Sequence, residues 1–161
     1  MAAFDRIMDY LNELGWVFNV ENAKRIIRFG VKAENGKLDV IIHWQESTNI
    51  VKCFSILPNN IPENKRVTVV DFLNRANYGL NIGNFELDME DGEVRYRTFL
   101  LDYREVDMQE IQHFIHVNLN MMDKYMSGIL QVALAGTSPA DAIKAIEDAA
   151  DDDLLRKLLN D

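Results

Sequence analysis

Three histidines and one cysteine are the side chains of this 161-residue chain best suited to metal binding or nucleophilic catalysis. His113 and His116 lie three residues apart, and Glu110 precedes His113 by the same spacing. On a helix this spacing places the three side chains on neighbouring turns, a geometry that could bind zinc. The pattern is short and common, and it falls away from the apolar stripe of its own segment. We therefore expect no metal and no other cofactor, and keep this three-residue metal site as an alternative.

Cys53 lies within a predicted strand, where a buried and unreactive thiol is usual. Because a single cysteine cannot form an intrachain disulfide, the sequence fits a reducing compartment, and we expect a cytoplasmic protein. Gly79, Gly83 and Gly92 match neither a Walker loop nor a dinucleotide-binding loop. No pair of carboxylates stands out as a general acid and base. The sequence therefore predicts no catalytic residue and no enzyme.

The charge balance limits the partners of the chain. It has 17 lysines and arginines against 26 aspartates and glutamates, a formal net charge of −9. Such an acidic surface repels phosphate groups, so we expect neither nucleic acid nor membrane as a partner. No stretch approaches the ~20 apolar residues of a membrane span. The length and the 48% hydrophobic content indicate one globular domain that folds by burial alone.

Two dipeptides, Asn35-Gly36 and Asp91-Gly92, predict the turns of two antiparallel hairpins. A two-residue turn at each site places apolar residues on one face of the strands and charges on the other. The charged pairs expected across the strands are Lys32 with Asp39, Asp88 with Arg95, and Glu86 with Arg97. A third strand over residues 50–57 ends at Pro58, because proline cannot donate to a sheet ladder.

Apolar residues at helical spacing predict helices on either side of these strands. The first covers residues 3–14, with Gly15 as its left-handed cap, and the second ends at Gly79. A long helix opens with a capping box at Asp107 and ends at Gly136. One or two short helices follow, with helix starts at Ser138-Pro139 and at the acidic run 151–153. The sequence thus predicts an α+β fold, with helices packed on one face of an antiparallel sheet built from hairpins.

The long helix and the leucine-striped tail are the candidate surfaces for a partner or a second subunit. Four of the seven methionines lie in the long helix, and methionine adapts well to varied partners, although core filling is its more common role. The tail can close on its own core or on a sister subunit, and the sequence leaves both open. The candidates are Met108, Ile115, Met122, Met126, Leu154, Leu155, Leu158 and Leu159.

Three segments together resemble the YbjN family of bacterial proteins. They are the asparagine-bearing stretch Asp71–Leu80, the Gly-x-Phe stretch Gly83–Asp88, and the Asp-Gly-x-x-x-Tyr-Arg return Asp91–Arg97. The resemblance implies a fold like that of class I type III secretion chaperones, which are small, acidic, usually dimeric proteins that bind segments of other proteins without catalysis. YbjN-like proteins are often described as sensory-transduction regulators. The motif residues, for which we expect structural roles, are Asn74, Asn77, Gly83, Phe85, Asp91, Gly92, Tyr96 and Arg97.

The sequence therefore leads to one main hypothesis. Residues 1–136 form a YbjN-like domain, and residues 137–161 are a helical extension of the same domain, with much of the uncompensated acidic charge between Glu147 and Asp153. The chain is a non-enzymatic protein-binding module, chaperone-like or regulatory, that acts as a homodimer on an unidentified protein partner. The alternatives are a metal-dependent enzyme or metal sensor and an assembly-forming structural subunit.

Overall fold

The computed structural model describes residues 2–102 and 105–160, without the side chains of residues 155 and 160. Its helices are α1 (Ala3–Glu13), α2 (Arg66–Gly79), α3 (Met108–Leu130) and α4 (Pro139–Asn160). Its strands are β1 (Phe18–Glu21), β2 (Ile26–Lys32), β3 (Lys37–Gln45), β4 (Ile50–Ile56), β5 (Asn84–Leu87) and β6 (Val94–Leu101). Short 3-10 turns cover Asn22–Lys24, Glu46–Thr48 and Glu63–Lys65, and a π-helical turn, Gln131–Ala135, follows α3.

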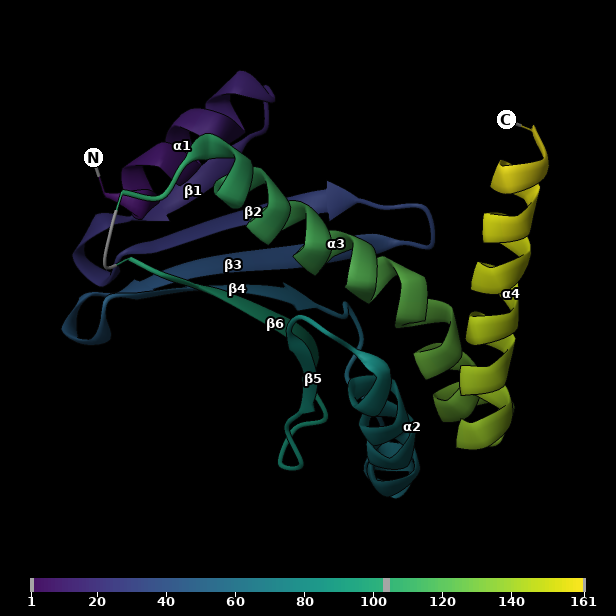
Figure 1. Ribbon diagram of the computed structural model, residues 1–161. Helices are drawn as coiled ribbons and strands as arrows, with labels where there is room; N and C mark the ends of the chain where they lie inside the picture. Colours follow the sequence, from purple (N-terminus) through teal and green to yellow (C-terminus); the bar gives the residue numbers. More distant parts are fainter. Residues whose placement is uncertain (1, 103–104, 161) are drawn as a thin grey trace.

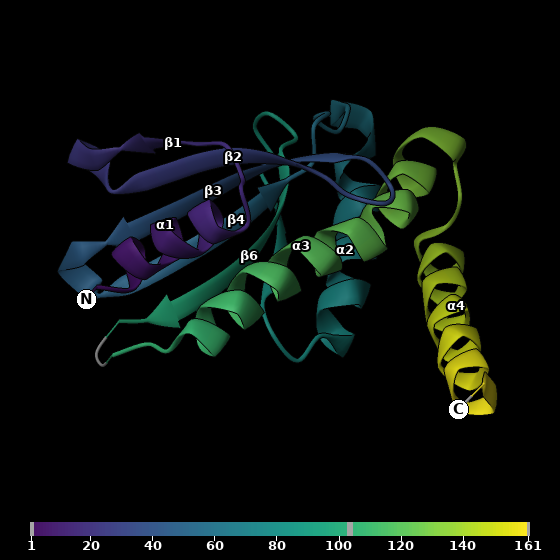
Figure 2. The ribbon, with the colours of Figure 1, turned by 90° about the horizontal axis from the view of Figure 1, so that it is seen from above.

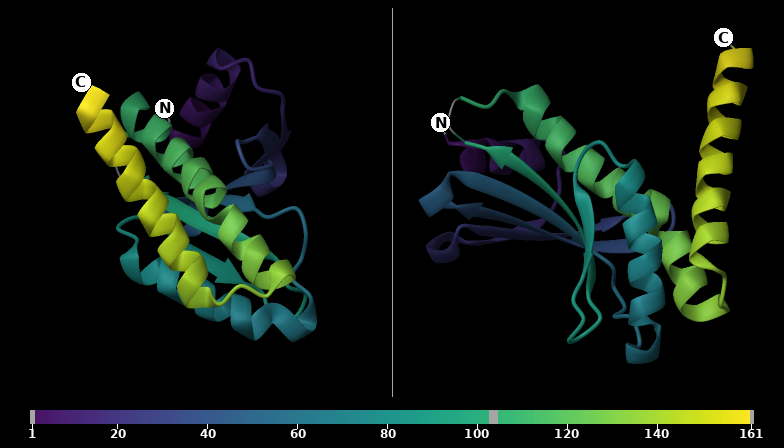
Figure 3. Two further views of the ribbon diagram at one scale, coloured as in Figure 1. Left: turned by 90° about the vertical axis from the view of Figure 1, so that its right-hand side faces the viewer. Right: turned by 60° about the horizontal axis from the view of Figure 1, so that its bottom comes forward.

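The strands form one antiparallel sheet in the order β1-β2-β3-β4-β6-β5. Figure 1 and Figure 2 show α1 and α3 lying on the same face of this sheet. Helix α2 lies beside β5 at one end, and α4 follows α3 and extends away from the sheet (Figure 3). The α+β class with helices on one face of an antiparallel sheet is confirmed.

Strand β1 is the element that the sequence analysis missed. It has only four residues, too few for a clear alternation of apolar and polar side chains. Its connection to β2 is a tight 3-10 turn that ends at Arg25 in the left-handed conformation, with φ of 53°. A non-glycine residue in that conformation gives no glycine or proline signal for a turn.

Both hairpin registers differ from the prediction by the same amount. In the first hairpin Lys32 lies opposite Lys37 and Asp39 opposite Gly30, so the expected pair of Lys32 with Asp39 is wrong. The turn lies one residue earlier than predicted because Asp123 of α3 binds it there. Asp123 accepts a hydrogen bond from the backbone nitrogen of Asn35 at 2.8 Å and another from the Asn35 side chain at 3.2 Å. The apolar and the charged residues stay on their predicted faces of the sheet, because a turn displaced by one residue shifts each pairing by two residues.

The second hairpin has a longer turn than two residues. The Asp88 nitrogen donates to the Glu93 carbonyl at 2.9 Å, and the side chains of Asp88 and Asp91 each accept a backbone hydrogen bond inside the turn. Arg95 therefore lies opposite Glu86 and not opposite Asp88, so the predicted pair of Asp88 with Arg95 is wrong. The predicted ion pair of Glu86 with Arg97 is present at 3.1 Å, on the diagonal.

The predicted helix termini are confirmed where a cap was recognised. Gly15 has φ of 68°, Gly136 has φ of 74°, and the capping box of Asp107 with Glu110 is formed. The tail is one continuous helix of 22 residues, so of the predicted one or two short helices there is one, it is long, and the predicted helix start at residues 151–153 is wrong. Ser138 caps it by accepting a hydrogen bond from the Asp141 nitrogen at 3.1 Å, and residues 145–150 contain no glycine or proline that would end the helix. The acidic run 151–153 consequently lies in mid-helix.

A polar cluster lies inside the core between α3 and the sheet. The Asn118 amide donates to the carbonyl oxygens of Cys53 and Tyr96, at 2.9 and 3.1 Å, and to the Thr98 hydroxyl at 3.0 Å. Its oxygen accepts a hydrogen bond from Ser55. Ser55, Thr98 and Asn118 are buried, so this network fixes α3 against β4 and β6.

Candidate partner-binding surface

Two of the three residues of the metal-site alternative, Glu110 and His116, are used elsewhere in the fold. Glu110 accepts a hydrogen bond from the Asp107 nitrogen as part of the capping box, and His116 hydrogen-bonds the Tyr10 hydroxyl at 2.7 Å. Within residues 2–102 and 105–160, no group of three His, Cys, Asp or Glu side chains is arranged to hold a metal ion. Cys53 is fully buried, and burial raises the pKa of its thiol, which disfavours the reactive thiolate. The contacts of Glu110 and His116 and the burial of Cys53 therefore do not favour metal or thiol chemistry at these residues.

The structure divides the apolar candidates of the long helix and the tail into two groups. Ile115, Met122 and Met126 are buried in the core, while Met108 is partly buried. Leu154, Leu158 and Leu159 are exposed on the part of α4 that extends away from the sheet (Figure 1). The side chain of Leu155 lies outside the described part of the chain. Of these candidates, only Leu154, Leu158 and Leu159 are described as exposed apolar side chains.

Asn77 of α2 holds the edge strand β5. Its side-chain amide donates to the Phe85 carbonyl at 3.1 Å, and its oxygen accepts from the Phe85 nitrogen at 2.7 Å. This pair of hydrogen bonds satisfies both backbone groups of Phe85, as a neighbouring strand would do. Asn74, one turn earlier, is exposed and lies at the same place between α2 and β5.

The other motif residues shape the β5–β6 hairpin. Gly83 has φ of 71°, and a Cβ there would come within 2.6 Å of the Arg97 carbonyl oxygen. The buried Tyr96 donates its hydroxyl to the Ile82 carbonyl, and burial raises its pKa to about 12. Phe85 is buried against Tyr96, with ring centroids 4.7 Å apart. These contacts are structural.

A groove of about 480 Å³ runs between α2 and β5. Apolar side chains line most of it, with Asn74 and Asn77 in between; the lining residues are Val67, Val70, Leu73, Asn74, Asn77, Phe85, Leu87 and Met89. Val67 is 74% exposed and Met89 50%, values that are high for apolar side chains beside a core. The sequence analysis missed the groove because Val67 lies off the apolar stripe of α2, a position normally polar.

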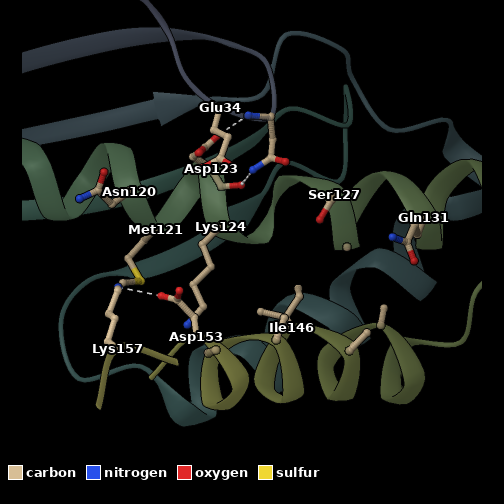
Figure 4. A pocket seen from close by; sticks show the side chains of 16 residues that line it. Glu34, Asn120, Met121, Asp123, Lys124, Ser127, Gln131, Ile146, Asp153 and Lys157 are labelled. Carbon is tan, nitrogen blue, oxygen red and sulfur yellow. Dashed lines mark hydrogen bonds and ion pairs between the residues drawn. The ribbon is translucent and has the colours of Figure 1, made fainter. Parts of the chain in front are cut away.

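A larger hollow of about 880 Å³ separates α3 from α4. Figure 4 shows Lys124 extending from α3 toward Asp153 of α4, and Asp153 bound to Lys157 at 2.7 Å. Gly128 lies at the base of the hollow, where a Cβ would come within 2.7 Å of both Phe72 and Ile146, so its lack of a side chain lets α2, α3 and α4 pack closely. The hollow mixes charged and apolar side chains, and it is less apolar than the α2–β5 groove.

Comparison with known proteins agrees with this architecture. The model of the YbjN family, described as "Putative bacterial sensory transduction regulator", matches residues 3–131. The chain belongs to the YbjN family. Helix α4 lies beyond the match, so the tail leucines are not part of the YbjN family core.

Two solved structures share the fold of this YbjN-family chain. A crystal structure of YbjN from E. coli, described as "a putative transcription regulator", superposes with a TM-score of 0.59 at 14% identity, covering 76% of this chain and 90% of that one. A crystal structure of the ExsC–ExsE complex superposes with a TM-score of 0.52 at 10% identity, covering 73% of this chain and 85% of that one. No curated protein matches the sequence. None of the described helices combines the length and apolar character of a membrane span.

Proposed function

We propose that this YbjN-family chain is a non-enzymatic protein-binding module that holds an apolar segment of a partner protein in the α2–β5 groove. The observation that carries the proposal is the exposure of Val67 and Met89 in a groove whose remaining lining is mainly apolar. Exposed apolar surface costs free energy in water, and covering it is the usual driving force of protein association. The structural neighbour ExsC was crystallised in complex with ExsE, which supports the same type of activity here.

The proposal includes a homodimer in which α4 provides part of the contact. We take residues 137–161 as a helical extension of the domain 1–136, because the first turns of α4 bury Ala142 and Ile143. Beyond them the helix exposes Leu154, Leu158 and Leu159 to solvent. A second copy would cover these leucines and so relieve the cost of their exposure.

Substituting Leu154, Leu158 and Leu159 by serine will convert the dimer into a monomer. The wild-type chain will show twice the monomer mass by light scattering at micromolar concentration. The triple variant will show the monomer mass and will still unfold in one cooperative transition, at a somewhat lower melting temperature because the dimer contact is lost. The matched control changes the exposed Ala140, Ala145 and Ala149 to serine, which leaves the leucines in place. A monomeric wild-type chain, or a dimeric triple variant, would contradict the role of α4.

Capture from the native host cells tests the protein-binding function. We expect the tagged full chain to retain one reproducible partner, and a Val67→Asp variant to retain it at least about tenfold less well, since a buried unpaired charge costs more than the 1.4 kcal/mol that tenfold represents. The control is Thr68→Asp, which adds the same charge at the next, exposed position of α2 outside the groove. Equal retention by the two variants would place the partner elsewhere, and no reproducible partner at all would reject the function.

A further inference from the structure

The face of the sheet opposite α1 and α3 is not covered by any helix of the described residues (Figure 1). Alternate residues of the strands point to this face, and they are exposed or half-buried where their neighbours are buried. We refer to it as the open face. Its main residues are Glu21 on β1, Ile26, Arg28 and Lys32 on β2, Lys37, Asp39, Ile41 and His43 on β3, Ile50, Lys52, Phe54 and Ile56 on β4, Glu86 on β5, and Arg95, Arg97, Phe99 and Leu101 on β6.

The charge of the open face is opposite to that of the chain. It has six arginines and lysines and three carboxylates, whereas the whole chain has 17 against 26. A basic surface on an acidic protein is a local feature that the net charge conceals. Solubility does not require it, because the rest of the chain already supplies a large net charge.

The strand registers place cations on both sides of an apolar centre. In one row across the sheet, Arg28 of β2 lies opposite Ile41 of β3, Ile41 opposite Phe54 of β4, and Phe54 opposite Arg97 of β6. The row spans three inter-strand steps, about 14 Å in all. The guanidinium of Arg95 lies 4.6 Å from the centre of the Phe54 ring, so the apolar centre is itself bordered by positive charge.

The carboxylates of this surface do not balance its cations. Glu86 is bound by both Arg95, at 2.7 Å, and Arg97, at 3.1 Å. Burial would raise the pKa of Glu86, but the hydrogen bond from Arg95 and the charges of Arg95 and Arg97 outweigh it and lower the pKa. One carboxylate neutralises one unit of charge, so this arginine pair keeps a net positive charge. The same holds for Glu21, which Arg28 and Lys24 share.

Two lysines at the turn end of the open face, with Asp39 as the diagonal neighbour of one of them, add further positive charge. Lys32 and Lys37 are directly opposite each other across β2 and β3, and neither forms an ion pair within residues 2–102 and 105–160. Like charges in directly opposite positions destabilise a sheet. Such an arrangement is explained more readily by a ligand that supplies negative charge than by folding.

Apolar side chains complete the surface. Phe99 is 58% exposed and Leu101 48%, and both lie on β6 next to the half-buried Phe54 and Ile50. The surface therefore combines exposed apolar area with flanking cations. A partner that covers it must have apolar side chains in its middle and carboxylates along its sides.

Building on the protein-binding role proposed above, we infer that the open face binds an acidic amphipathic helix of the partner protein. A helix about 10–12 Å across covers two strands, so a helix lying along β3 and β4 would set its apolar stripe on Ile41 and Phe54. Carboxylates on its two flanks would then reach Arg28 on one side and Arg97 on the other. A nucleic acid fits less well, because most of the apolar centre is aliphatic and the net charge of −9 repels a polyanion.

Fluorescence anisotropy with defined probes tests this inference on the full chain. The probe is a labelled amphipathic helical peptide with a leucine stripe flanked by glutamates. Its comparison probes are the same peptide with lysine in place of glutamate, a sequence-scrambled glutamate-leucine peptide, and single-stranded oligouridine. The test variant is Arg28→Glu with Lys52→Glu, and the control variant Lys144→Glu with Arg156→Glu makes the same change of net charge on α4. Melting temperatures establish that both variants are folded.

We expect the glutamate-flanked peptide to bind the wild-type chain, more weakly as salt rises, and the open-face variant to bind it at least about tenfold less tightly. The α4 control will bind within about threefold of wild type. Absence of binding up to about 1 mM peptide, equal loss in both variants, equal binding of the scrambled peptide, or preference for oligouridine would each overturn the inference.

The same variants separate this inference from the proposed function. If capture from host cells depends on Val67 but is unchanged by Arg28→Glu with Lys52→Glu, the protein-binding function stands and the open face is not its site. If neither variant affects capture, both locations are wrong even though a partner exists.

Discussion

Replacing Gly92 by alanine will lower the free energy of unfolding by about 4 kcal/mol, one of the largest effects that a single methyl group can have in this chain. Gly92 has φ of 86°, a conformation that costs any other residue backbone strain. A Cβ there would also collide with the Ile61 carbonyl oxygen and come within 2.9 Å of the Ile61 nitrogen. These are backbone atoms, and the Ile61 nitrogen already donates to the Gly92 carbonyl at 2.8 Å, so they cannot move aside without breaking that hydrogen bond.

Urea unfolding followed by circular dichroism measures this effect, and Gly79→Ala is the matched control. Gly79 is the last residue of α2, its φ is not positive, and no atom lies within 4 Å of a Cβ built there. Alanine at residue 79 should leave the stability unchanged or raise it slightly, since alanine is the better helix former. A loss below about 1 kcal/mol for Gly92→Ala would show that the hairpin does not pack on the loop before α2 as described.

Replacing Asn118 by alanine will cost about 3 kcal/mol, because the substitution removes four hydrogen bonds from a site with no access to water. The Ser55 hydroxyl loses its acceptor. The Thr98 hydroxyl loses the Asn118 donor and keeps its bond to the Phe114 carbonyl, and the carbonyl oxygens of Cys53 and Tyr96 each lose one donor. The removed amide also leaves a cavity between α3 and the sheet. The melting temperature should fall by several degrees, roughly 2–4 °C for each kcal/mol in a domain of this size.

Asn120→Ala is the control for this second prediction. Asn120 lies on the exposed side of the same helix, two residues along, so the change in helix propensity is the same. We expect its effect to stay within about 0.5 kcal/mol of wild type. Equal stability of the two variants would mean that the buried network contributes nothing to the attachment of α3.

The sequence predicts best those features that neighbouring residues determine. Gly15, Gly136 and the Asp107 capping box end or begin helices through contacts within a few residues, and each is confirmed. The predicted hairpin registers were wrong because residues that are distant in sequence bind the turns. Asp123 binds the first turn although it lies 88 residues further along the chain. At Gly36, next to this turn, an added Cβ would come within 2.9 Å of the Met126 sulfur. The sequence preference for two-residue turns depends only on neighbouring residues, so it cannot predict such contacts.

The sequence predicted the candidate site less well than it predicted the fold. The apolar periodicity of α3 identifies its buried stripe, but it does not distinguish a core stripe from an exposed one, and Met122 and Met126 proved to be core. Asn118 looks like any polar residue of a helix until the strands carrying Ser55 and Thr98 are placed beneath it. Similarly, the basic open face depends on which strands are neighbours. Arg28 and Arg97 are far apart in sequence and become the two ends of one row only through the sheet order.

The two proposed binding surfaces lie on either side of β5. The α2–β5 groove lies on the helix side, and Glu86 with Arg95 and Arg97 lies on the open side of the same hairpin. Because Asn77 occupies the outer edge of β5 at Phe85, a partner meets a closed edge at that residue. Partner recognition at this edge is therefore expected through side chains rather than by addition of a strand.

Site-specific photocrosslinking in the native host tests the central claim, that the α2–β5 groove binds a protein, most directly. A photoreactive amino acid replaces Val67 inside the groove, and in a second strain it replaces Thr68 just outside it. The account predicts one reproducible crosslinked protein from residue 67, identified by mass spectrometry, and a much weaker product or none from residue 68. Equal products from the two positions, or no protein crosslinked at residue 67, would contradict it.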